Sequence, residues 1–147
     1  MPANQLSRPQ NITAWVLQIA VAAIFAPMLI GKFTGAEEAV YIFETVGIEP
    51  WGRLATAGAE TIAIILLLTP RTAVFGAALS AVVIMGAIMS HLTSLGVTLT
   101  FPSGETDGGA TFVMAVAILI ASSVVLFIRR RSIPVIGAKL GTQAQAA

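Results

Sequence analysis

Four long apolar runs alternate with shorter polar segments along the chain. Apart from single charged residues, the runs cover about residues 13–32, 54–69, 72–95 and 110–128. A helix that crosses a bilayer needs about 20 predominantly apolar residues, and only the second run is short by this measure. Because backbone hydrogen bonds must be satisfied internally in lipid, the pattern predicts an all-α integral membrane protein. We expect four transmembrane helices in an antiparallel bundle, forming one domain over residues 1–147.

A polar segment with helical periodicity separates the first two runs. Four of its residues recur at the spacing of one helix face: Ala36, Val40, Phe43 and Gly47. Glutamates fill positions between them, so we expect a short amphipathic helix over residues 35–46 that lies at the membrane interface. Gly47 should end this helix. Residues 47–53 should form a turn that places Trp51 at the level of the lipid headgroups.

The remaining connections are expected to be turns and loops. Residues 70–71, a Pro-Arg pair, predict a tight hairpin, and residues 96–109 form a polar loop rich in turn-forming residues. Pro27 should kink the first helix or free a carbonyl group. A signal peptide is the alternative for the first run, because residues 20–22 resemble a cleavage site. The run continues to Ile30, which favours a membrane span.

The composition agrees with a membrane protein. Of the 147 residues, 56% are hydrophobic and 10% are charged, and the mean hydropathy is +0.90. A soluble domain carries about 25% charged residues, so these values exclude a disordered or nucleic-acid-binding protein. The absence of cysteine excludes disulfides, iron–sulfur clusters and thiolate zinc sites, and the single histidine argues against a tightly held metal. We expect no metal and no covalently bound cofactor, so any redox centre belongs to a partner.

The distribution of lysine and arginine predicts the orientation in the membrane. Six basic residues lie on the side that holds both termini and the 70–71 hairpin: Arg8, Arg71, Arg129, Arg130, Arg131 and Lys139. Lys32 and Arg53 lie on the other side. By the positive-inside rule both termini are cytoplasmic, including a tail over residues 129–147. The outer side also carries six acidic residues, which either keep its loops solvated or attract a cationic substrate or partner.

Glu60 is the strongest candidate for chemistry, because it lies inside the second apolar run. A carboxylate at this depth is costly unless it is paired, protonated or turned toward a cavity. Glu60 therefore either takes part in a binding or proton-transfer site or forms an interhelical contact that only fixes the packing.

Three further polar residues should reach the same outer half of the bilayer, because the helices alternate in direction. Lys32 closes the first run, His91 lies near the end of the third, and Thr111 begins the fourth. Lys32 either pairs with Glu60 or extends to the headgroups. Histidine titrates near neutral pH, so His91 either relays protons or serves as a hydrogen-bonded packing residue. Arg53 should contact headgroups or anchor a loop.

Together these residues predict a polar pocket that opens outward. In it, Glu60 and His91 would relay protons, while Lys32, Glu60, His91 and Thr111 would bind a ligand. Stripes of small residues on the third and fourth helices should let neighbouring helices approach closely. The sequence contains no catalytic triad, phosphate-binding glycine loop or metal motif that would define a reaction.

Several short motifs carry a resemblance to a known family. They are Gly31-Lys32-Phe33, Pro50 after the interfacial segment, Gly58-Ala59-Glu60, and Leu66-Leu67-Leu68-Thr69-Pro70-Arg71-Thr72-Ala73 running into Gly76-Ala77. In these motifs, over about residues 12–130, the chain resembles the DoxX family of small four-span bacterial membrane proteins. Residues 62–63 are Ile-Ala, where glycines usually follow the family's glutamate. The resemblance implies a location in the bacterial inner membrane, with Lys32 and Glu60 matching the family's first-span lysine and second-span acid.

The resemblance also implies a function. The family takes its name from a subunit of a terminal quinol oxidase, and a relative is a subunit of a thiosulfate:quinone oxidoreductase. We therefore expect an accessory subunit of a quinone-linked membrane redox system, with a quinone as possible ligand. Besides the lipid bilayer, its partner would be a redox subunit or a second copy of the chain. Two alternatives stay open: a small proton-coupled transporter of lipophilic or cationic solutes, and a structural or assembly subunit without its own activity.

Overall fold

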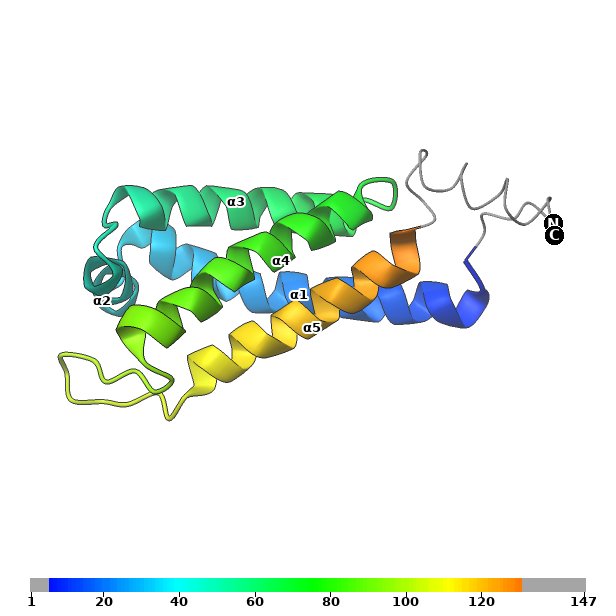
Figure 1. The fold of residues 1–147 in the computed structure, drawn as a ribbon. Coiled ribbons are helices and arrows are strands. Elements are labelled where there is room, and N and C mark those ends of the chain that lie inside the picture. Colours follow the sequence, from blue (N-terminus) through cyan, green and yellow to red (C-terminus); the bar gives the residue numbers. More distant parts are fainter. Residues whose placement is uncertain (1–5, 131–147) are drawn as a thin grey trace.

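The computed structural model describes residues 6–130, which form a bundle of helices (Figure 1). In chain order the elements are α1 (Arg8–Thr34), α2 (Glu37–Val46), α3 (Trp51–Leu68), α4 (Ala73–Ser90), a π-helical turn η1 (His91–Leu95) and α5 (Ala110–Arg129). Within residues 6–130, four segments are long and apolar enough to cross a membrane: α1, α3, α4 continued by η1, and α5. This confirms the predicted all-α bundle of a multi-pass membrane protein. Apart from residues 129 and 130, the predicted tail lies outside the described residues.

Each spanning helix packs against two others. α1 contacts α3 and α5, and α4 contacts the same two helices. The short helix α2 lies across one end of the bundle, where it touches α1, α3 and η1 (Figure 1). We call this end the α2 end. The opposite end, where α1 begins and α5 finishes, is called the Arg129 end.

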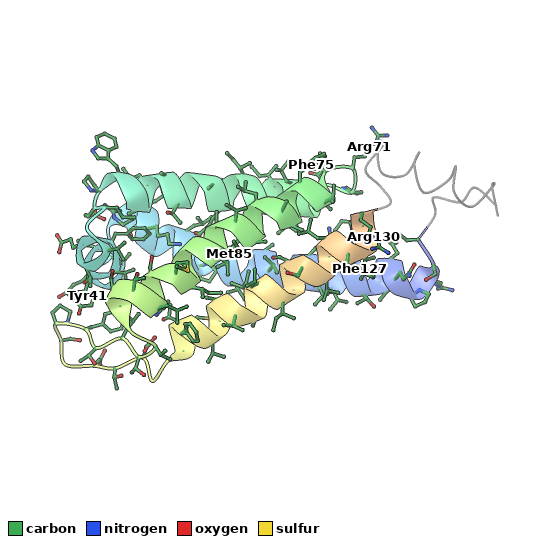
Figure 2. All side chains as sticks on the ribbon, viewed as in Figure 1. Tyr41, Arg71, Phe75, Met85, Phe127 and Arg130 are labelled. Atoms are coloured by element: carbon green, nitrogen blue, oxygen red, sulfur yellow. The ribbon has the colours of Figure 1, made fainter. Side chains whose placement is uncertain are left out.

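Apolar side chains lie both inside the bundle and on its outer surface. The core is built around Phe25, Leu67, Ala77 and Ile118, which are buried between the helices. Large apolar side chains are also exposed on every spanning helix, among them Ile19, Ile65, Met85 and Phe127; Figure 2 labels the last two. A soluble bundle would expose polar residues at such positions, whereas a lipid-facing surface is apolar. The exposed side chains therefore give the bundle a surface suited to lipid.

α1 is longer than the predicted first span. It begins at Arg8 because Ser7 forms a capping box: the Ser7 hydroxyl accepts from the Gln10 amide at 3.4 Å, and Gln10 Oε1 accepts from the Ser7 amide at 3.1 Å. The helix continues through Pro27 to Thr34. Gly35 then ends it with φ of 72°, a left-handed conformation that favours glycine.

The connection between α2 and α3 differs from the prediction. α2 is confirmed as a short helix that Gly47 ends, with φ of 82°. The predicted turn over residues 47–53 is wrong for its last three residues, because α3 begins at Trp51. The Leu54 amide already bonds to the carbonyl of Pro50 at 3.1 Å, so the helical hydrogen bonds continue across the glycine at position 52. Proline favours helix starts because its φ is already helical, and this outweighs the turn tendency of the glycine.

α3 and α4 approach each other closely at Gly76. A Cβ atom placed on Gly76 would lie 2.4 Å from the backbone nitrogen of Leu67 and 3.0 Å from the carbonyl oxygen of Ala63. Only glycine fits at this crossing, which agrees with the small-residue stripe expected on α4. The hairpin between the helices is tight, as predicted, and Thr72 Oγ1 donates to the Leu66 carbonyl at 3.1 Å.

Candidate ligand-binding cavity

A cavity of about 800 Å³ lies at the α2 end of the bundle. The four spanning helices and α2 all contribute to its walls. Most of its lining is apolar, with Met28, Phe43, Ile84 and Ile118 as examples. Binding sites for small molecules are typically about 300–1,000 Å³ in volume, with mainly apolar walls and a few polar groups.

All four predicted ligand-binding residues line this cavity. α1 provides Lys32, α3 provides Glu60, η1 provides His91, and α5 provides Thr111. Their convergence on one cavity is a finding of the structure. Their roles in ligand binding and proton relay stay predictions.

Lys32 and Glu60 form a buried ion pair. Lys32 Nζ donates to Glu60 Oε1 at 2.5 Å, and the two residues are 8% and 2% exposed. Lys32 was predicted either to pair with Glu60 or to extend to the headgroups. In the structure it pairs with Glu60. The second oxygen, Glu60 Oε2, is buried without a hydrogen-bond partner among the described residues. Because Glu60 lines the cavity, this oxygen is placed to accept a hydrogen bond from a ligand.

Arg53 holds the backbone that carries Lys32. Its guanidinium donates to the carbonyl oxygen of Lys32 and pairs with Glu49, with Nη2 2.7 Å from Oε1. A cation near the end of α1 also interacts favourably with the negative end of the helix dipole. Arg53 was predicted either to contact headgroups or to anchor a loop, and these contacts show it as a loop anchor. It joins the end of α1 to the start of α3 and so helps fix the ion pair.

His91 is oriented by the chain that follows it. Its Nδ1 lies 2.7 Å from the carbonyl oxygen of Gly96, so Nδ1 carries a proton and donates. In the neutral ring, Nε2 is then the acceptor. The ring also meets Phe112 edge to face, with 5.5 Å between the centroids. His91 is the first residue of the π-helical turn η1. Such π-helical turns frequently occur at functional sites.

The loop that follows η1 contributes to the cavity wall and is organised by Asp107. Its Oδ1 accepts from the amides of Leu99 and Gly109 at 2.8 and 2.9 Å, and its Oδ2 accepts from the amide of Thr111 at 3.1 Å. Partial burial raises the pKa of Asp107, but these hydrogen bonds together outweigh it and lower the pKa to about 2. Asp107 lines the cavity, and both of its oxygens are occupied in holding Thr111 and the start of α5.

Sequence reasoning missed a second polar cluster, at the Arg129 end. Arg129, predicted to begin a cytoplasmic tail, is the last residue of α5 and is only 5% exposed. Its Nε donates to Gln18 Oε1 at 2.6 Å. Arg129 therefore belongs to α5 and not to the predicted tail, which begins at least one residue later. A basic residue at the end of an apolar run fits the positive-inside pattern whether it is exposed or buried, so the sequence carried no signal to separate the two.

The arrangement at the α2 end offers a defined set of polar groups. Lys32 Nζ is a donor, Glu60 Oε2 and His91 Nε2 are acceptors, and the Thr111 hydroxyl can act as either. Within the described ranges, no group of three or more His, Asp or Glu side chains is placed to hold a metal ion. The cavity can thus accommodate a lipophilic molecule with a polar headgroup, and two of its residues can exchange protons.

Comparison with known proteins found no family model, curated protein or solved structure that matches the chain. The class of the protein, a multi-pass helical membrane protein with a cavity inside the bundle, therefore rests on its own fold and geometry.

Proposed function

We propose that the protein is a DoxX-like accessory subunit of a quinone-linked membrane redox system and that the cavity at the α2 end binds a quinone. One observation carries the proposal: an apolar cavity of about 800 Å³ contains a buried ion pair and a histidine brought together from three helical segments. A quinone combines an apolar ring and tail with two polar oxygens. Such a ligand matches a cavity with apolar walls and few polar groups.

The polar groups suit both redox forms of a quinone. Lys32 Nζ can donate to a quinone carbonyl, whereas Glu60 Oε2 and His91 Nε2 can accept from the hydroxyls of the quinol. Reduction of a quinone consumes two electrons and two protons. The electrons come from the redox centre of a partner subunit, and the protons pass through Glu60 and His91.

The orientation is part of the same proposal. Arg8, Arg71 and Arg130 lie at the Arg129 end, and the positive-inside rule places this end in the cytoplasm of a bacterial cell. The cavity then lies in the outer half of the inner membrane, where its ligand is reached from the lipid or from the outer side.

The ion pair weighs against the transporter alternative. A carboxylate that binds a lipophilic cation has to offer an uncompensated negative charge, whereas the charge of Glu60 is already matched by Lys32 at 2.5 Å. The cavity therefore favours a neutral lipophilic ligand over a cationic one.

Binding of a short-chain quinone to the full-length protein in mild detergent tests the proposal. We expect saturable thermal stabilisation of the protein by the quinone. The stabilisation should be lost in Glu60→Gln and His91→Asn and kept in Glu105→Gln, whose exposed side chain lies outside the cavity. Tetraphenylphosphonium, a lipophilic cation, serves as the competing probe. Stabilisation by the cation alone would favour transport, and stabilisation by neither compound would contradict the proposal.

A further inference from the structure

Arg129 at the end of α5 is a buried cation held in a fixed position. Its Nε donates to Gln18 Oε1 at 2.6 Å, and Gln18 Nε2 donates in turn to the carbonyl oxygen of Leu67. The ring of Trp15 lies against the guanidinium, with its centroid 5.7 Å from Cζ. These contacts link α1, α3 and α5 and fix the plane of the guanidinium.

The positive charge of Arg129 has no counter-charge in the described chain. Gln18 is neutral, and both atoms of its amide are already used. Arg129 Nη2 is buried and has no hydrogen-bond partner among residues 6–130. The acidic residues of this range all belong to α2, α3 or the connections at the α2 end: Glu37, Glu38, Glu44, Glu49, Glu60, Glu105 and Asp107. A buried, unpaired cation is strongly unfavourable, so Arg129 calls for an anion from outside this range.

The surroundings indicate the chemistry of that anion. Arg8 begins α1, and Arg71 lies at the same end of the bundle (Figure 2). A carboxylate or phosphate would find several cations here, and the planar fork of an arginine matches the geometry of a phosphate. Arg129 is also the last residue of a helix that is long and apolar enough to cross a membrane. The end of such a helix is where lipid headgroups meet the protein. Trp15 belongs to the residue type that is enriched at this level.

We propose that Arg129, positioned by Gln18 and Trp15, is the centre of an anion site that binds a phosphate group. The source that the position favours is the headgroup of an anionic phospholipid, and inorganic phosphate offers the same chemistry from solution. The site lies at the opposite end of the bundle from the quinone cavity, and it does not depend on the function proposed for that cavity.

Lipid retention by the full-length protein tests this site. The protein is equilibrated in detergent with equal amounts of phosphatidylglycerol and phosphatidylcholine, and native mass spectrometry measures which lipid remains bound. We expect the wild-type protein to retain phosphatidylglycerol in preference to phosphatidylcholine. Arg129→Gln should lower this retention roughly tenfold, because it removes a charge-assisted hydrogen bond. Arg130→Gln is the matched control, since the Arg130 side chain stacks on Phe127, with Cζ 3.9 Å from the ring centroid.

Each outcome decides the proposal. Equal retention of the two lipids by the wild-type protein overturns it, even if Arg129→Gln does not fold. An equal loss in both arginine variants also overturns it, because general attraction to the basic end would then be sufficient. In Arg129→Lys, which keeps the charge without the fork, we expect intermediate retention. Addition of inorganic phosphate separates the two sources: displacement of the lipid assigns the site to any phosphate, and retention assigns it to the phospholipid.

Discussion

Lys32 and Glu60 stand 28 positions apart in the sequence and meet inside the bundle, with Nζ 2.5 Å from Oε1. The contact joins the end of α1 to the middle of α3 at the wall of the cavity. Each charge is tolerated at this depth because the other is present. The pair therefore contributes to the structure and to the candidate site at the same time.

Removal of one partner of this pair should destabilise the protein more than removal of both. Lys32→Met alone leaves the Glu60 carboxylate buried and unpaired, at a cost of about 3–5 kcal/mol. The double variant Lys32→Met/Glu60→Gln should lose less stability than Lys32→Met alone, because no charge is then left buried without a partner. Thermal or denaturant unfolding of the four proteins of this cycle in detergent gives the coupling energy. Additive losses would show that the two side chains do not interact.

The close contact between α3 and α4 predicts a clear difference between two glycines. Gly76→Ala places a methyl group against the backbone of Leu67, and we expect a loss of stability of about 1–3 kcal/mol. Gly58→Ala on α3 meets nothing within 4 Å, so its higher helix propensity should leave stability unchanged or slightly raised. Melting temperatures of the two variants measure the difference. A tolerated alanine at position 76 would mean that the helices are further apart.

Asp107 should make the stability of the loop over residues 96–109 depend on pH. Its folded-state pKa of about 2 lies below the ordinary value of 3.8, so its ionised form stabilises the folded protein above the ordinary value. This contribution is lost as the pH falls toward 2. Asp107→Asn should cost about 1 kcal/mol at neutral pH, because it removes the negative charge that strengthens the hydrogen bonds from Leu99, Gly109 and Thr111. The difference in stability between wild type and variant should narrow as the pH falls from about 5 to about 2.

Unfolding curves over this pH range measure the effect of Asp107. Glu105→Gln is the control in the same loop, because the Glu105 side chain is exposed. A gap that stays constant with pH would show that the Asp107 carboxylate does not hold the loop in its charged form.

The predicted orientation can be measured directly, because the chain has no cysteine that would have to be removed first. Arg71→Cys in the hairpin and Glu105→Cys in the loop are both at exposed positions, at opposite ends of the bundle. In intact cells, a membrane-impermeant maleimide should label Glu105→Cys and leave Arg71→Cys unmodified until the membrane is opened. The reverse pattern would place the cavity in the cytoplasmic half of the membrane.

The sequence predicted the spanning helices well because lipid imposes a simple rule on them. Length and hydropathy located each one, and the main differences lie at helix starts such as Arg8 and Trp51, where local capping decides the boundary. The capping box at Ser7 and Gln10 was readable from the sequence. The start at Trp51 was hidden by the glycine that follows it.

The order and alternating direction of the helices also predicted that the candidate site residues would lie close together. Alternating helices bring Lys32, Glu60 and His91 to one end whatever the details of packing, and the structure places all three on one cavity. The size of that cavity depends on how far the helices diverge, which periodicity does not encode. Glu60 appeared in the sequence as the one conspicuous charge, yet Lys32, Arg53 and Arg129 are also buried. Each of these cations lies near the end of an apolar run, where composition cannot separate a buried residue from an exposed one.

The face of α1 that carries Gln18 and Lys32 also has an electrical consequence. The two residues are 14 positions apart, or about 21 Å along the helix. Apolar side chains fill the core between them, including Phe25, Leu67 and Ile118. A layer of this kind has a low dielectric constant, so most of a voltage applied across the bundle falls within it. Arg129 and Glu60 lie at opposite faces of this layer, so a voltage across the bundle places the two buried charges at different electrical potentials.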